Sequence, residues 1–313
     1  MAINLKDKSR AGIGPIENAM LALKYSEVFY SAQGEGKYVG IPSLWIRFFL
    51  CNLQCNGFGQ DDPTDPSTYE LPYETLDISD ITTVFDLPVF AKGCDSSYTW
   101  SKKYRHLITN RTVNQAVDEL TTLLPHGKFE HPMTGQEVHM VFTGGEPMLK
   151  KTQPGMIGVL EEFGLRGNMP NYVTIETNGT RPITDDLAVY IQDWSSNGRE
   201  WYWSLSPKLW NTAGEKTTRA IKPKVIGKYA EISPHGQLKF VVNGSEESWK
   251  EVEEYTKRFR DAGCDFPVWI MGVGGTFEGL VQTEASIADE AIQRGYYYTS
   301  RMHVHIYGNI VGK

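Results

Sequence analysis

Cysteine is scarce in this chain, with four residues among 313, and basic residues do not exceed acidic ones, since the formal net charge is −7. So few cysteines argue against the disulfide framework of small secreted proteins. An acidic balance is untypical of proteins whose main task is to bind a nucleic-acid backbone, because such proteins carry a basic face. We therefore expect no nucleic-acid partner and another use for the cysteines.

Long apolar runs and repeats are also missing. No stretch of 18 or more apolar residues occurs, and the first ten residues, MAINLKDKSR, contain no apolar signal core. These absences predict a cytoplasmic protein without a membrane partner. No fixed-period repeat and no segment of linker composition is found, so residues 1–313 are interpreted as a single domain that opens with an N-terminal arm, residues 1–24.

Three of the four cysteines lie close to one predicted strand. Cys51 and Cys55 follow an apolar run over residues 44–50, and Cys94 follows an insertion over residues 56–93 that is rich in Asp, Pro, Thr and Ser. Thiolates are soft ligands for zinc or an iron–sulfur cluster, and three of them leave one coordination position open. A metal or cluster site is one interpretation, and buried reduced cysteines are the other.

Predicted strands and helices alternate about six times along the chain. Strands are expected over residues 44–50, 138–142, 172–177, 202–205, 237–242 and 268–271, and helices over residues 113–124, 156–163, 246–262 and 277–294. Residues 301–307 alternate like a further strand and carry two histidines. This order predicts an α/β protein with a parallel sheet or barrel.

Polar and glycine-rich segments follow several of these strands. They are TGGEP at residues 143–147, ETNGT at residues 176–180 and SPK at residues 206–208. Paired glycines let a backbone approach a ligand closely, and a carboxylate accepts from a cation or an amine. Because parallel strands end at one face, these segments are expected to join the cysteines there.

Three polar residues near the first predicted strands have open interpretations. Gln33 and Glu35 lie in a glycine-rich segment that either faces a ligand or forms an ordinary turn. Arg47 interrupts an apolar strand, and a buried charge must be paired. It therefore reaches the surface, pairs with an acidic neighbour on an adjacent strand, or binds an anion such as a carboxylate.

Seven motifs occur in a fixed order along the chain: FYSAQGEG, SLWIRFFLCNLQC, CDSSYTW, FTGGEP, IETNGT, SLSPK and QLKFVV. Together they resemble the radical S-adenosylmethionine (SAM) enzymes of the 7-carboxy-7-deazaguanine synthase family, from about residue 25 to residue 307. The resemblance implies a partial TIM-like (β/α)6 radical SAM barrel with a long insertion in the cluster-binding loop. It also implies a lyase that contracts the ring of 6-carboxy-5,6,7,8-tetrahydropterin to 7-carboxy-7-deazaguanine with loss of ammonia, in 7-deazaguanine (queuosine-type) biosynthesis.

The resemblance also assigns roles to individual residues. The three cysteines would hold a 4Fe-4S cluster, whose fourth iron would bind SAM. Further SAM contacts are expected from Gly144, Gly145, Glu146, Glu176, Ser206 and Lys208. The pterin would be bound by Gln33, Glu35, Arg47 and His303, with His305 as the alternative histidine. Magnesium would be held by Asp95 and Ser96, and the family usually has threonine at the position of Ser96. A helix or turn cap formed by Asp95 explains that residue equally well.

Partners and alternatives complete these expectations. A reduced flavodoxin or ferredoxin is expected as electron donor, and the chain is expected to form a homodimer. An activating enzyme for glycyl-radical proteins would share the cysteines and GGEP, and a zinc-binding structural or interaction protein would explain the cysteines alone. The chain departs from the family in its long insertion and in Gly93, which stands where an aromatic residue is expected; Phe58 is a candidate for that adenine contact.

Overall fold

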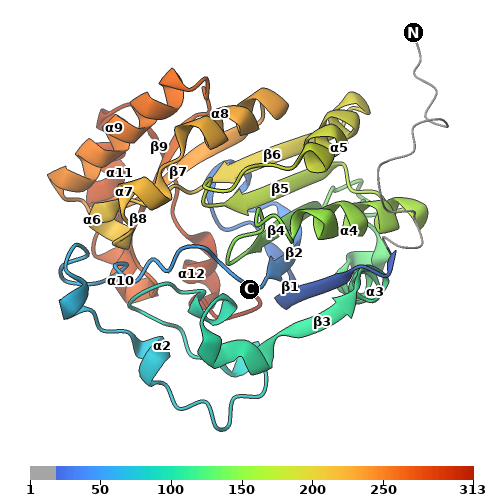
Figure 1. Ribbon diagram of the computed structural model, residues 1–313, viewed down its shortest axis with the longest axis horizontal. Coiled ribbons are helices and arrows are strands. Elements are labelled where there is room, and N and C mark those ends of the chain that lie inside the picture. Colours follow the sequence, from blue (N-terminus) through green and yellow to red (C-terminus); the bar gives the residue numbers. More distant parts are fainter. Residues whose placement is uncertain (1–18) are drawn as a thin grey trace.

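The computed structural model describes residues 19–313, and a nine-stranded sheet runs through them (Figure 1). The strands are β1 (Ala22–Ala32), β2 (Pro42–Phe48), β3 (Thr109–Thr112), β4 (His139–Gly144), β5 (Tyr172–Thr177), β6 (Glu200–Leu205), β7 (Gly236–Val242), β8 (Val268–Gly272) and β9 (Tyr297–Tyr298). Their order is β3-β1-β2-β4-β5-β6-β7-β8-β9. From β2 to β9 every neighbouring pair is parallel, whereas β1 is antiparallel to β2 and β3.

Helices follow the strands and cover the outer face of the curved sheet (Figure 1). The α-helices among residues 19–313 are α2 (Pro72–Thr75), which belongs to the insertion, α3 (Val113–Leu123), α4 (Gln153–Leu165), α5 (Asp185–Ser196), α6 (Trp210–Ala213), α7 (Thr217–Ala220), α8 (Pro223–Ile232), α9 (Glu246–Asp261), α10 (Phe277–Val281), α11 (Glu284–Gln293) and α12 (Met302–Tyr307). Neighbours pack in the order α3-α4-α5-α8-α9. The inner face of the sheet is left for α12 and the chain end.

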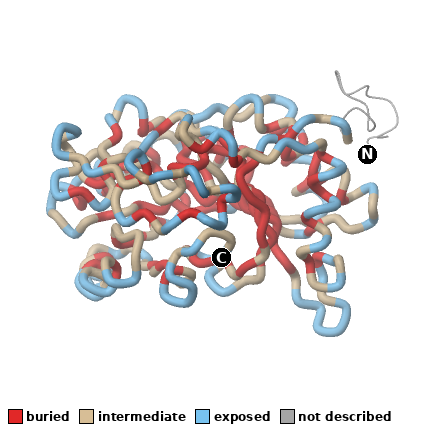
Figure 2. The backbone as a smooth tube through the Cα atoms, turned by 90° about the horizontal axis from the view of Figure 1, so that it is seen from below, coloured by how far each residue is buried: buried red, intermediate tan, exposed pale blue. Residues whose placement is uncertain are grey.

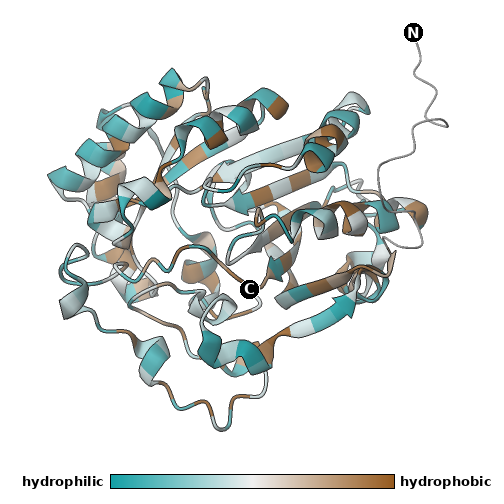
Figure 3. Cartoon of the chain, in the orientation of Figure 1, coloured by the Kyte–Doolittle hydropathy of each residue, from teal (hydrophilic) through white to brown (hydrophobic). Residues whose placement is uncertain are grey.

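Local sequence explains why the outer helices form. Thr112 caps α3 and makes a capping box with Gln115, an arrangement that stabilises a helix by about 1 kcal/mol. In α9, acidic residues occupy the first turn and basic residues the last, as the helix dipole favours. Both helices bury one apolar side, and Figure 3 shows α9 as mainly hydrophilic elsewhere. The buried residues are concentrated along the central strands (Figure 2).

The insertion, residues 56–93, packs as a small unit beside the sheet. Its apolar side chains join those of residues 98–107 in a second hydrophobic cluster formed by Tyr73, Val84, Leu87, Phe90, Tyr98, Tyr104 and Leu107. Within it, the rings of Tyr73 and Trp100 meet edge to face, with centroids 5.4 Å apart. The excursion between Cys55 and Cys94 is therefore anchored by its own core, which fixes where Cys94 returns.

The predicted α/β fold with its parallel strands is confirmed, with two local errors. Residues 301–307 form the helix α12 and not a strand: Gly308, at φ +70°, ends the helix and donates to the Val304 carbonyl at 2.9 Å. The helix predicted over residues 277–294 is broken into α10 and α11. Of the predicted arm, residues 1–18 lie outside the described residues, and its last residues already belong to β1. Within residues 19–313, no helix combines the length and apolarity needed to cross a membrane.

Candidate functional site

A cavity of about 280 Å³ opens at the C-terminal ends of the parallel strands. Its walls combine strand-end residues from β2 to β8 with the insertion and with residues 309–313. The carboxyl ends of the strands converge there, which is where barrels of this class keep their sites. Every site residue predicted from the sequence lines this cavity except Glu146.

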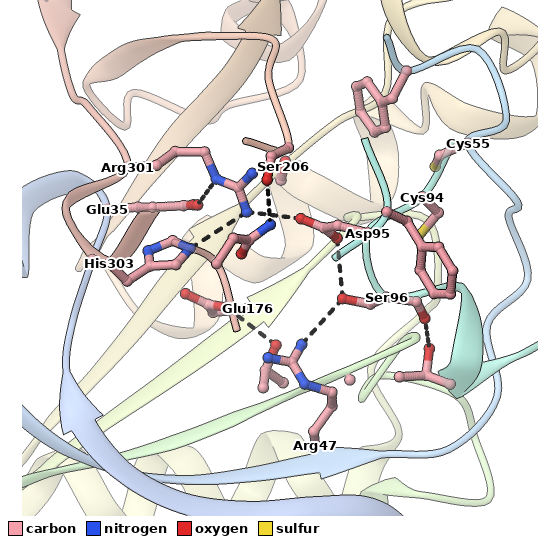
Figure 4. Close-up of a pocket in the computed structure, with 18 of the residues that line it drawn as sticks. Glu35, Arg47, Cys55, Cys94, Asp95, Ser96, Glu176, Ser206, Arg301 and His303 are labelled. Atoms are coloured by element: carbon pink, nitrogen blue, oxygen red, sulfur yellow. Dashed lines mark hydrogen bonds and ion pairs between the residues drawn. The ribbon is translucent and has the colours of Figure 1, made fainter. Parts of the chain in front are cut away.

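The three predicted cluster ligands reach the cavity from two loops, and Figure 4 labels Cys55 and Cys94. Cys51 and Cys55 lie in the loop after β2, and Cys94 returns at the end of the insertion. Burial raises the pKa of Cys51 to about 12 and that of Cys94 to about 11, so these sulfurs are protonated thiols in the metal-free chain. Binding to a metal centre would ionise them, because the cation stabilises a buried thiolate. Cys264 lies in the hydrophobic core, away from the cavity.

The donor set fits a cluster better than a single ion. Among residues 19–313, no three His, Cys, Asp or Glu side chains lie close enough to hold one metal ion, as a zinc site would require. In an iron–sulfur cluster the cysteines bind different irons, so their sulfurs share a cavity without converging on one point. Three thiols that line one cavity match that arrangement.

Glu215, which sequence reasoning missed, supports the cysteine loop from behind. Its Oε1 accepts from the backbone N–H groups of Gln54 at 2.6 Å and Cys55 at 2.9 Å. Arg219, on the next turn of chain, donates to the carbonyl of Asn52 at 2.8 Å. Cys55 has φ +54°, which is uncommon for a residue with a side chain. The two hydrogen bonds from these backbone N–H groups to Glu215 therefore stabilise a turn that the backbone alone disfavours.

The paired glycines are required by close packing against the cysteine loop. A Cβ added at Gly144 would lie 2.4 Å from the Phe48 carbonyl oxygen, and one at Gly145 would lie 2.3 Å from the Leu50 carbonyl oxygen. Gly144 also has φ +153°. No side chain fits at either position, so the backbone of this loop borders the cavity directly.

Glu146 is a correction to the sequence prediction, because its carboxylate does not reach the cavity. Its Oε1 accepts from the N–H of Met148 at 2.9 Å and the hydroxyl of Thr177 at 2.5 Å, and its Oε2 accepts from the N–H of Asn178 at 2.8 Å. Burial raises the pKa of Glu146, while these three donors favour the ionised form. The side chain joins the loops after β4 and β5, and is not offered to a ligand.

Lys208, Ser206 and Phe58 lie together on the cysteine side of the cavity. The Lys208 ammonium donates to the Ser206 hydroxyl at 2.9 Å and lies 5.7 Å from the centre of the Phe58 ring. Lys208 thus lines the site and is not a solvated surface lysine. Phe58 supplies an aromatic face in the wall that also contains the cysteines.

Glu176 lies at the floor of the cavity at the end of β5. Its carboxylate accepts from the Gln33 amide at 3.3 Å and from the Thr143 hydroxyl at 3.1 Å. Neutral donors from the residue after β1 and from β4 therefore hold it in place, and Gln33 is buried and lines the site. The ordinary-turn interpretation of Gln33 is incomplete, because its side chain joins two strand ends.

Arg47 pairs with an acidic neighbour on an adjacent strand, one of the interpretations left open. Its Nε donates to Glu27 on the adjacent strand β1 at 2.5 Å, and Glu27 also accepts from the Tyr98 hydroxyl at 2.8 Å. The Nη1 end is directed at the cavity, where the Ser96 hydroxyl lies 3.5 Å away (Figure 4). The ion pair fixes the arginine, and its outer edge stays available to an anion.

A buried chain of charges crosses the other side of the cavity. Glu35 forms ion pairs with Lys239 and with Arg301, whose Nε lies 3.1 Å away. Burial opposes ionisation of Glu35, but these two cations hold its pKa well below the usual range. Lys239 and Arg301 were missed by sequence reasoning. Lys239 interrupts the apolar strand QLKFVV as Arg47 interrupts its own strand. The rule that a buried charge must be paired therefore also predicts a partner for Lys239.

The structure distinguishes the two C-terminal histidines. His303 lines the cavity on α12, and burial lowers its pKa to about 4, so it is neutral at physiological pH. His305 points away and lies 3.0 Å from Glu284. On a strand the two would share one face, whereas on the helix they face different ways.

Asp95 and Ser96 do not fit the predicted magnesium ion. Asp95 Oδ2 accepts from Arg301 at 2.7 Å, and its Oδ1 accepts from the Ser96 hydroxyl at 3.1 Å. Magnesium requires oxygen ligands that are free to coordinate. Here the single carboxylate is engaged by a guanidinium, and Arg47 borders the hydroxyl.

No family model matches the chain. It is similar to curated proteins named 7-carboxy-7-deazaguanine synthase. The protein from Halobacterium salinarum is 27% identical, covering 97% of this chain and 95% of that protein. Those from Rhodopirellula baltica and Pyrobaculum aerophilum are 25% and 24% identical, each covering 92% of this chain. The resemblance found in the sequence is confirmed by these relatives.

The fold has a counterpart among solved structures. The crystal structure of QueE from Escherichia coli superimposes with a TM-score of 0.50 and 16% identity, covering 91% of this chain and 96% of that one. The expected barrel fold is thus confirmed.

Proposed function

We propose that this chain is a 7-carboxy-7-deazaguanine synthase, a radical SAM lyase that converts 6-carboxy-5,6,7,8-tetrahydropterin to 7-carboxy-7-deazaguanine and ammonia. The observation that carries the proposal is the meeting of Cys51, Cys55 and Cys94 in one cavity, although 38 residues separate the last two. The similarity to curated synthases over nearly the whole chain supports the same activity.

The cavity fits a 4Fe-4S cluster and SAM as cofactors. The three cysteines would bind the cluster, and the backbone at Gly144 and Gly145 would accept from the SAM amino group. Glu176 and Ser206 would bind ribose hydroxyls, with Lys208 and the Phe58 ring beside them. When bound, this pair of cofactors supplies the radical chemistry of the reaction. The protein's part is to orient the reactants and exclude solvent, for which the buried cavity walls are suited.

The substrate would lie on the side of the cavity formed by Gln33, Glu35, Arg47 and His303. The outer edge of Arg47 would bind the pterin carboxylate, because a guanidinium pairs with two oxygens in a fork. Gln33 and Glu35 would read the pyrimidine edge, and neutral His303 would close the pocket from α12. Magnesium does not fit Asp95 and Ser96 and is not part of this proposal. We further expect a reduced flavodoxin or ferredoxin as electron donor, and a cytoplasmic homodimer.

The decisive experiment is anaerobic turnover by the reconstituted protein. The chain is incubated with SAM, a reductant and 6-carboxytetrahydropterin, and the product and ammonia are quantified by mass spectrometry and an enzymatic assay. We expect one ammonia for each 7-carboxy-7-deazaguanine formed, and none with a Cys55→Ala variant. Cleavage of SAM without any loss of the pterin would reject this substrate and favour another radical SAM activity.

A further inference from the structure

The strongest unassigned feature of the cavity is the guanidinium of Arg301. Its side chain is only 11% exposed, and it joins three segments that are far apart in the sequence. Nε donates to Glu35 at 3.1 Å, Nη1 donates to the Gly274 carbonyl at 2.8 Å, and Nη2 donates to Asp95 at 2.7 Å (Figure 4). Because three separate segments bind this buried arginine, its position is fixed and it belongs to the wall of the site.

The position of this guanidinium matters because Asp95 is the carboxylate expected to hold a metal. A hard divalent cation held by Asp95 and Ser96 would lie beside the Arg301 guanidinium, which already binds Asp95 Oδ2, while the other oxygen, Oδ1, accepts from Ser96. Arg47 lies on the other side of the pair, with Nη1 3.5 Å from the Ser96 hydroxyl. Two fixed positive charges therefore border the Asp95 carboxylate, and both would repel a divalent cation bound there.

We propose that Arg301 replaces a divalent cation beside Asp95 and Ser96, so that this chain positions the carboxylate end of its substrate with two guanidinium groups and needs no magnesium. The positioning of the substrate by Arg301 and Arg47 rests on the proposed function, whereas the exclusion of the cation does not.

The chemistry of the guanidinium suits this task. It stays ionised at all physiological pH values, and it needs no loading from solution. Of its five N–H donors, three bind Glu35, Gly274 and Asp95, and a fourth is directed at His303 Nε2, 3.4 Å away. The second N–H of Nη1 is the donor that these contacts leave for an anionic or carbonyl oxygen of a ligand, and Arg301 lines the cavity together with Arg47. A metal ion would perform the same positioning by coordination.

The first test measures cation binding directly, without turnover. Free Mn²⁺, which substitutes for Mg²⁺ and gives a six-line electron paramagnetic resonance signal, is titrated with the reconstituted enzyme after treatment with a chelator. We expect the parent to leave the signal undiminished. Loss of one equivalent of signal that is restored in an Asp95→Asn variant would overturn the proposal.

The second test asks whether removing the guanidinium creates the missing site. Arg301→Gln should bind one Mn²⁺, and the double variant Arg301→Gln/Asp95→Asn should not. Arg301→Lys, which keeps the charge, should behave as the parent, and Arg258→Gln on the exposed side of α9 is the matched control. A folded Arg301→Gln variant that binds no Mn²⁺ would contradict the proposal; if it does not fold, the parent and Arg301→Lys titrations decide.

Turnover then tests the functional half of the inference. Parent activity should change by less than about twofold when Mg²⁺ is added back to chelated enzyme. Arg301→Gln should lose about a hundredfold in activity without Mg²⁺, because the substrate is misplaced, and should recover part of it with Mg²⁺. A parent that requires Mg²⁺ would refute the replacement. An absence of product under every condition would instead reject the proposed function, and the Mn²⁺ titration would still test Arg301.

Discussion

Replacing Glu215 should loosen the loop that carries two of the cluster ligands. Glu215 is buried, and its carboxylate accepts from the N–H groups of Gln54 and Cys55. A hydrogen bond to a charged group contributes about 1.5–3 kcal/mol net, so Glu215→Ala should lower the free energy of unfolding by about 3 kcal/mol. Glu215→Gln keeps an oxygen acceptor of similar shape and should cost about 1 kcal/mol.

Two measurements check this expectation. Urea unfolding of the metal-free protein gives the change in stability, and iron content after reconstitution reports whether the loop still binds a cluster. Iron content should fall in the order parent, Glu215→Gln, Glu215→Ala, because the left-handed turn at Cys55 loses its support. Glu231→Ala, at an exposed ion pair with Lys228, is the matched control and should match the parent. Parent-like stability and iron content in Glu215→Ala would refute the supporting role.

Three further predictions concern other parts of the molecule. Cys264→Ala should retain the parent's iron content, whereas alanine at any of the three predicted ligands should abolish it; loss of the cluster in the Cys264 variant would overturn the assignment. Arg47→Lys and Arg47→Ala should both lose the preference for the carboxylated pterin over an analogue without the carboxylate, in a binding assay with cluster and SAM retained; undiminished preference would assign the carboxylate to another residue. Burial lowers the pKa of His139 to about 4, so the unfolded chain binds a proton between about pH 6.5 and 4 that the folded chain does not. His139 should therefore lower the free energy of unfolding by up to about 3 kcal/mol as the pH drops through this range, beside a similar contribution from buried His303, and His139→Phe should make the slope shallower, as urea unfolding at several pH values would show; an unchanged slope would contradict it.

Local patterns determined most of the fold in advance. Segments rich in β-branched and aromatic residues, such as residues 172–177, and the cap at Thr112 place strands and helices where the structure has them, because backbone preference and side-chain period act over a few neighbouring residues. The same locality explains the error at residues 301–307. Met302, Val304 and Ile306 alternate as in a strand, but the parallel sheet ends at β9, and no further strand among residues 19–313 pairs on that side.

The site was determined by the sequence only where a residue follows its strand directly. Cys51, Gly144 and Glu176 are carried to one face by parallel strands, so their position in the chain is enough to bring them together. The tertiary structure alone decided the partners of those residues. Arg301 meets Asp95 across 206 residues, and Glu215 supports Cys55 across 160 residues. Such contacts depend on how separate loops pack and on which buried charge needs a counter-charge, and neither condition leaves a periodic pattern in the chain.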